Sequence, residues 1–152
     1  MSINTKKLNY DLMFGLKSEK WIKKILEKYL NQNISKLDTY NNFDFKGEKI
    51  YIEIKTRRIN HNQYKSLMFS KKKLDKGLSH FMDNGSDILF IWRCYDGIYG
   101  WYFIKDNEIY DNYTIEMSGR KDRGLDEIEE CVHINVHDLF KIEISEEIIS
   151  SY

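Results

Sequence analysis

Proline is absent from this 152-residue chain, and cysteine occurs only twice, at Cys94 and Cys131. Two distant cysteines without a CxxC pair exclude a disulfide-rich secreted scaffold and favour a reducing environment. No apolar run approaches the length of a membrane span, and the N-terminal residues lack the apolar core of a signal peptide. We therefore expect a soluble intracellular protein, cytoplasmic or nuclear, that makes no membrane contact.

An excess of charge of one sign is also missing, because 24 basic and 24 acidic residues cancel. Overall charge therefore gives no support for a nucleic-acid partner. The charges are nevertheless segregated. Residues 46–76 hold ten Lys or Arg against three acids, a local charge of +7, and residues 122–147 hold nine acids against two bases, a local charge of −7. Either block fits a solvated surface, but the basic block also fits a surface that binds a polyanion.

The sequence has no glycine-rich phosphate loop, serine-nucleophile motif, internal repeat or interdomain linker. Its hydrophobic content of 41% and aromatic content of 14% are those of a folding chain rather than a disordered one. At this length we expect one globular domain covering residues 1–152. Abundant Ile, Asn, Lys and Tyr without Pro fits an AT-rich genome, as found in many bacteria, phages and large viruses.

Hydrophobic periodicity predicts a mixed α/β fold with a single central sheet and flanking helices. Apolar residues at helical spacing predict one helix over 15–30, and Ser70 is a plausible cap for a second over 71–83, closed by Asn84-Gly85. Alternation over 41–45 and 49–58 predicts a β-hairpin, and the apolar runs 87–95 and 98–105 predict central strands. We expect residues 116–130 to form a mobile surface loop, followed by a strand at 132–136 and a short C-terminal helical piece.

The second hairpin strand carries the polar residues of greatest interest. Alternation places the isoleucines of IYIEI on one face and Tyr51, Glu53, Lys55 and Arg57 on the other. Asp44 lies on the preceding strand, so its carboxylate can converge with that of Glu53. Converging carboxylates suit Mg²⁺, and a neighbouring lysine can orient a water nucleophile and offset developing negative charge. An ordinary surface ion pair would explain Glu53 and Lys55 equally well without Asp44.

These residues, in this order, resemble the PD-(D/E)XK nuclease superfamily. The segments GLKSE (15–19), FDF (43–45), IEIKT (52–56) and MFSKKKL (68–74) look most like archaeal-type Holliday junction resolvases and their phage and viral relatives. The resemblance implies a restriction-endonuclease-like αβββαβ core over about 15–105, with 106–152 as a C-terminal extension. Phe43 replaces the proline that precedes the aspartate in the superfamily pattern, and nothing after Ile109 matches it.

The resemblance also implies a role for each polar position. Asp44 and Glu53 would be metal ligands, Glu19 a third acid at the metal, and Lys55 the catalytic lysine. Ser70, or Gln63 before it, would fill the polar position after the lysine, and both would be nucleic-acid contacts. The implied cofactor is Mg²⁺, with Mn²⁺ as a substitute. The implied substrate is DNA, including branched or junction DNA, and the implied enzyme is a homodimer. For Glu19 the alternative is an exposed ion pair at i+4 with Lys23.

Basic residues on either side of these positions are candidates for phosphate contacts. Arg57 and Arg58 follow the strand directly, and their alternative is a pair of strand-end charges. The cations Lys71, Lys72 and Lys73 stand in the first turn of a helix, where they oppose the helix dipole. Phosphate binding would explain that placement, and a solvated turn would also accommodate it.

Three functions follow from these observations. The first is a Mg²⁺-dependent DNA endonuclease. The second is a catalytically inactive module that binds nucleic acid through residues 46–76. The third is a protein-interaction role on the same fold. Cleavage of nucleic acid would indicate the first function, and binding without cleavage the second. Absence of binding at low salt would indicate the third.

Overall fold

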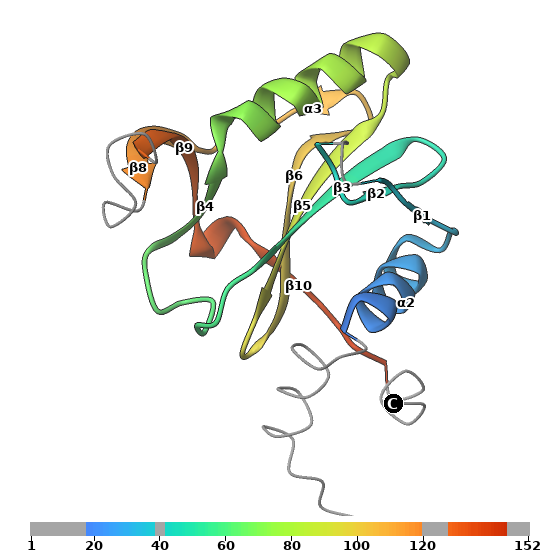
Figure 1. Cartoon of the computed structure of the whole chain (residues 1–152), viewed down its shortest axis with the longest axis horizontal. Coiled ribbons are helices and arrows are strands. Elements are labelled where there is room, and N and C mark those ends of the chain that lie inside the picture. Colours follow the sequence, from blue (N-terminus) through green and yellow to red (C-terminus); the bar gives the residue numbers. More distant parts are fainter. Residues whose placement is uncertain (1–17, 39–41, 120–127, 146–152) are drawn as a thin grey trace, which may run out of the picture.

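The computed structural model describes residues 18–38, 42–119 and 128–145. Figure 1 shows how the elements are arranged. In chain order they are α2 (Ser18–Leu30), β1 (Ser35–Lys36), β2 (Phe45–Lys46), β3 (Ile50–Thr56), β4 (Ser66–Ser70), α3 (Lys71–Asn84), β5 (Asp87–Cys94), β6 (Gly97–Lys105), β7 (Glu108–Ile109), β8 (Thr114–Gly119), β9 (Ile128–Asn135), the 3-10 helix η3 (Val136–Asp138) and β10 (Phe140–Ile142). Neither helix in these ranges is long and apolar enough to cross a membrane.

The larger sheet has the strand order β1-β2-β3-β5-β6-β10, and β7 pairs with β6. Strands β3 and β5 are parallel, whereas the other neighbours are antiparallel. The chain passes from β3 to β5 through β4 and α3, as a parallel pair requires. This arrangement confirms the predicted mixed α/β fold with a restriction-endonuclease-like core.

Both faces of the central strands are covered. On one face, Trp21, Ile25 and Leu26 of α2 pack with residues such as Ile52 and Ile91. The opposite face belongs to a second core built from α3, β4 and β9. Its buried side chains include Leu67, Phe69, Leu74, Phe90, Trp92, Trp101, Val132 and Ile134. The apolar run 87–95 is therefore a strand buried on both faces, as predicted.

A second, three-stranded sheet with the order β4-β9-β8 was missed by the sequence analysis. No strand was predicted between residues 58 and 71, yet Ser66–Ser70 forms β4. The predicted mobile loop over 116–130 is also wrong at both ends, because 116–119 belong to β8 and 128–130 to β9; residues 120–127 lie outside the described ranges. Strand β8 does not bury its apolar side chains, since Ile115 and Met117 are both exposed. The strand predicted at 132–136 is confirmed for its β9 part.

Ser70 caps α3, as the sequence predicts. Its hydroxyl accepts a hydrogen bond from the Lys72 amide (3.2 Å) and donates one to Glu129 Oε2 (3.1 Å). Loss of a serine N-cap costs about 1 kcal/mol. We expect Ser70→Ala to lower the free energy of unfolding by about that amount in urea denaturation. Ser79→Ala, in the interior of α3, is the control and should show no such loss, because alanine has the higher helix propensity.

Candidate active site

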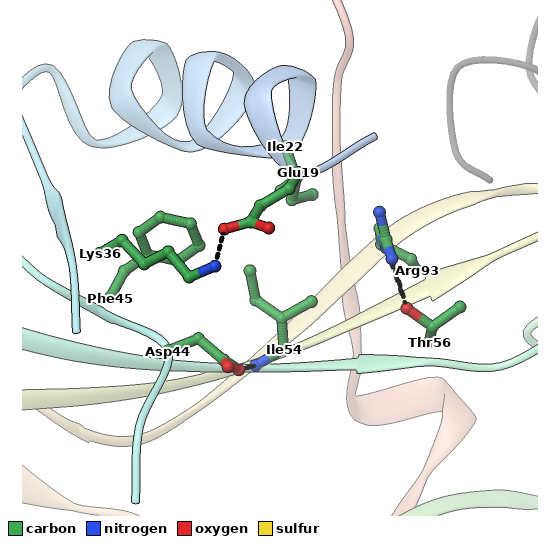
Figure 2. A pocket seen from close by; sticks show the side chains of 8 residues that line it. All are labelled: Glu19, Ile22, Lys36, Asp44, Phe45, Ile54, Thr56 and Arg93. Carbon is green, nitrogen blue, oxygen red and sulfur yellow. Dashed lines mark hydrogen bonds and ion pairs between the residues drawn. The ribbon is translucent and has the colours of Figure 1, made fainter. Parts of the chain in front are cut away.

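Asp44 lies immediately before β2, where the β2–β3 ladder ends. The first paired residue is Phe45, opposite Ile52. Beyond it, the Asp44 amide donates to the Ile52 carbonyl (2.9 Å), and Asp44 Oδ2 accepts a hydrogen bond from the Ile54 amide (2.7 Å). The side chain thus replaces a missing strand carbonyl. The second oxygen, Oδ1, has no hydrogen bond to the described part of the chain. Figure 2 shows the carboxylate at this position.

Glu53 is a buried carboxylate between two ammonium groups. Its relative exposure is 4%, so the predicted polar face of β3 is itself covered. Glu53 Oε1 lies 3.3 Å from Lys55 Nζ, and Oε2 lies 3.2 Å from Lys73 Nζ. The Oε2 atom is fully shielded from solvent and has no hydrogen bond of good geometry. Glu53 and Lys55 are therefore side by side, as predicted, and α3 adds a second cation.

The charges of Asp44 and Glu53 are coupled. Burial raises the pKa of Glu53, and the charge of Asp44 raises it further, whereas Lys55 and Lys73 lower it. The site thus disfavours the ionised form of Glu53. A divalent cation would relieve both the burial cost and the repulsion, and Mg²⁺ needs only one or two protein carboxylates.

The raised pKa of Glu53 predicts a pH dependence of stability in metal-free protein. A raised pKa means that the folded state holds the proton more tightly than the unfolded chain does. This stabilisation is complete below the ordinary value of 4.5 and is lost as the pH rises through the raised pKa. The unfolding free energy of wild type, relative to Glu53→Gln, should therefore fall as the pH increases above 4.5. Urea denaturation in EDTA measures this difference, and the exposed Glu48→Gln serves as the control.

A cavity of about 250 Å³ opens on the α2 side of Asp44. Figure 2 shows its lining residues, which are Glu19, Ile22, Lys36, Asp44, Phe45, Ile54, Thr56 and Arg93. A water in the liquid takes about 30 Å³, so the cavity has room for a phosphate group with several waters. Glu53 and Lys55 do not line it. Asp44 therefore lines this cavity and also interacts electrostatically with the buried Glu53.

Glu19 lies in the first turn of α2 and reaches the same cavity as Asp44. Its carboxylate forms an ion pair with Lys36 on β1, rather than the i+4 pair with Lys23 that was the alternative to a metal role. Within the described ranges, no three or more His, Cys, Asp or Glu side chains are placed to hold one metal ion. As the structure stands, Asp44 and Glu53 are the coupled acids, and Glu19 lies in the cavity beside them.

Arg93 is a site residue that the sequence analysis missed. It ends β5 beside Thr56 of β3, and its Nε and Nη2 atoms donate to Thr56 Oγ1 (3.0 and 2.7 Å). Burial lowers the pKa of Arg93, while the charges of Glu19 and Asp44 act in the opposite direction. The signal in the sequence was a lone arginine in the interior of an otherwise apolar run, in a strand predicted to be covered on both faces.

The loop after β3 carries the predicted DNA-contact residues Arg57, Arg58 and Gln63. His61 fixes this loop to the β5–β6 turn, because its amide and its Nδ1 atom both bind the Asp96 carboxylate. Burial pushes the pKa of Asp96 upward, but the hydrogen bonds and charge of His61 outweigh it, so the pKa is lowered. Arg58 and Gln63 are exposed on this anchored loop, and Arg57 is half-buried.

The three lysines at the start of α3 have different surroundings. Lys71 pairs with Asp75 one turn later (3.0 Å), and Lys72 lies 3.9 Å from Glu129. Lys73 instead contacts Glu53 and is only 24% exposed. Lys72, with a side chain 88% exposed, is thus the most accessible of the three to a phosphate.

The model of the family described as "Phage putative PDDEXK endonuclease" matches residues 5–142. The chain belongs to this phage PDDEXK endonuclease family. The match includes Asp44, Glu53, Lys55 and Arg93, and it extends past Ile109, where the motif resemblance ended. It supports a PD-(D/E)XK nuclease of phage origin acting on DNA, without showing a likeness to Holliday junction resolvases in particular. No curated protein and no solved structure matches the chain significantly.

Proposed function

We propose that the chain is a Mg²⁺-dependent endonuclease that hydrolyses phosphodiester bonds in DNA. The observation that carries this proposal is the buried carboxylate of Glu53 beside Lys55, on the strand whose Ile54 amide binds the carboxylate of Asp44. A protein without a ligand for these groups has little physical reason to bury a carboxylate next to another. Membership in the PDDEXK endonuclease family supports the same reading.

Asp44 and Glu53 would hold the metal ion. Asp44 Oδ1 has no hydrogen bond from the described residues, whereas Glu53 Oε2 would have to exchange the ammonium group of Lys73 for the metal. Carboxylate oxygens are the ligands that Mg²⁺ or Mn²⁺ accepts. When bound, the ion polarises a phosphoryl oxygen and lowers the pKa of a coordinated water. Glu19 would join only after leaving Lys36, so we assign it a supporting role.

Lys55 would be the catalytic lysine. Its side chain is 27% exposed and its ammonium group lies beside Glu53, so the lysine is held in position while the side chain still reaches solvent. In that place it can orient the attacking water and offset the negative charge that develops on the phosphate oxygens. Lys73, on the other oxygen of Glu53, lowers the pKa of this carboxylate against the larger effect of burial.

The DNA would approach over the basic residues near the carboxyl end of β3. Arg58 and Gln63 are exposed in the loop after β3, and Lys72 is exposed at the start of α3 beside Ser70 and Lys71, so these side chains can contact phosphates. The proposal includes branched or junction DNA as substrate and a homodimer, in line with the motif resemblance. A dimer would supply two active sites, one for each of two strands of a junction.

Cleavage of labelled closed circular, linear duplex, single-stranded and four-way-junction DNA tests the proposal. We expect cutting with Mg²⁺ or Mn²⁺ and none in EDTA. Cutting of closed circles identifies an endonuclease, and faster cutting of the four-way junction supports the proposed substrate. Light scattering measures the oligomeric state.

An inactive nuclease fold that binds nucleic acid is the second candidate. One observation favours it: Glu53 is already paired with two lysines, which reduces its need for a metal ion. Salt-sensitive DNA binding without cleavage, across all substrates and both metals, would establish this candidate. No binding at low salt would indicate a protein-interaction role instead.

A further inference from the structure

We propose that Arg93 binds a phosphate of the DNA backbone inside the cavity that Asp44 lines. This inference rests on the proposed nuclease function and adds a substrate contact outside the Asp44, Glu53 and Lys55 set. It is carried by the position of the guanidinium group, its hydrogen bonding and the charge balance of the cavity.

The guanidinium group of Arg93 is fixed on one side and unsatisfied on the other. Two of its nitrogens donate to Thr56 Oγ1, and the residues are direct neighbours in the parallel pair β3–β5. The third nitrogen, Nη1, is shielded from solvent and has no hydrogen-bond partner in the described ranges. Figure 2 shows Arg93 at the border of the cavity, with Thr56 beneath it.

An unsatisfied buried donor is unusual, because it loses its bonds to water without replacing them. A purely structural arginine at the end of β5 would be expected to use all its donors. The spare donor of Arg93 instead belongs to a side chain that lines a cavity with room for a phosphate group. Guanidinium groups suit phosphate oxygens, since their planar fork can make two parallel charge-assisted hydrogen bonds.

The charge balance of the cavity links phosphate binding to the metal. Two acids, Glu19 and Asp44, face two bases, Lys36 and Arg93, so the formal charge of the lining is zero. A divalent cation on Asp44 would raise this charge to +2, and the cavity would then attract an anion. Arg93 should therefore contribute to DNA binding mainly when Mg²⁺ is present.

The salt dependence of DNA binding tests this inference. The variants are made in a Lys55→Met background, so that DNA is bound in Mg²⁺ with little cleavage. Arg93→Gln keeps a donor for Thr56 but removes the charge. We expect the slope of log Kd against log salt to fall by about 0.9, as for the loss of one phosphate contact, and the affinity to fall about tenfold. Arg93→Lys should keep the slope.

Two further variants separate phosphate binding from a structural role. Thr56→Val removes the hydrogen-bond acceptor but leaves the charge of Arg93, so the salt slope should stay unchanged. Arg93→Met is the second neutral variant should Arg93→Gln fold poorly, with thermal unfolding as the check. In the Lys55-containing protein, Arg93→Gln should also cut DNA about 10²-fold more slowly.

Two results would overturn the role of Arg93 alone. One is a folded neutral variant that binds DNA with the same salt slope as the protein that keeps Arg93. The other is an effect of the Arg93 variants on the salt slope that is the same with and without Mg²⁺. Failure of the unmodified protein to bind or cut DNA would overturn the proposed function, and the inference with it. The two failures are thus distinguishable.

Discussion

Replacing Lys55 by methionine is expected to slow DNA cleavage by about 10²–10³-fold, as for loss of one preorganised electrostatic group. Methionine keeps much of the side-chain volume and removes the ammonium group beside Glu53. Binding of DNA in Mg²⁺ should change little, because most phosphate contacts come from other basic residues. Single-turnover cleavage and a binding titration measure the two effects separately.

Lys73→Met is the matched control for this variant. Both lysines contact a Glu53 oxygen, at 3.3 and 3.2 Å, and both are about one quarter exposed. If Lys55 has a catalytic role, the loss of Lys73 should slow cleavage far less than the loss of Lys55. Equal losses would mean that both lysines only neutralise Glu53. Cleavage at the wild-type rate by Lys55→Met would remove Lys55 from the site altogether.

Replacing Asp44 by asparagine should abolish metal-dependent cleavage, with a loss of at least about 10³-fold, while leaving the fold intact. The asparagine carbonyl can still accept the hydrogen bond from the Ile54 amide, so the end of the β2–β3 ladder remains satisfied. The negative charge that attracts the metal is gone. Asp44→Ala removes both features and should also lower the unfolding free energy by about 1–3 kcal/mol, the cost of an unsatisfied amide.

The comparison of the two Asp44 variants distinguishes chemistry from scaffolding. Cleavage and urea denaturation are measured on both. A stable Asp44→Asn protein that does not cut indicates a metal ligand. An Asp44→Asn protein as unstable as Asp44→Ala would attribute the loss of cleavage to the ladder, and one that cuts normally would contradict the assignment.

The elements with strong periodicity could be predicted from the sequence. The helix ending at Leu30, the capped helix after Ser70 and the apolar strand at 87–95 follow from local patterns. The proximity of Glu53 and Lys55 follows from their spacing on a strand, and the nearness of Asp44 follows from the hairpin. The fold class was confirmed on this basis, while the roles of these side chains remain predictions.

The remaining features depend on contacts between distant parts of the chain. Glu53 is buried because the second sheet and α3 cover its face, and that sheet joins Ser66–Ser70 to Ile128–Asn135 across about sixty residues. No local sequence pattern predicts the pairing of two strands so far apart in the chain. The contact of Lys73 with Glu53 likewise requires the packing of α3 against β3, and the pairing of Glu19 with Lys36 requires the placement of β1.

Arg93 illustrates a different limit. Its hydrogen bonds to Thr56 depend on the parallel register of β3 and β5, and a single sequence does not reveal that register. The strand predicted from 87–95 was correct, and Arg93 is the only charged residue in the interior of this run. A lone arginine in a strand covered on both faces is a signal for a buried polar site.

The nicking of closed circular DNA in Mg²⁺, by wild type and Asp44→Asn side by side, tests the central claim most directly. The account predicts nicking by wild type that EDTA stops, and no detectable nicking by a folded Asp44→Asn protein. Equal nicking by the two proteins, or nicking that persists in EDTA, would contradict a metal-dependent site built on Asp44, Glu53 and Lys55.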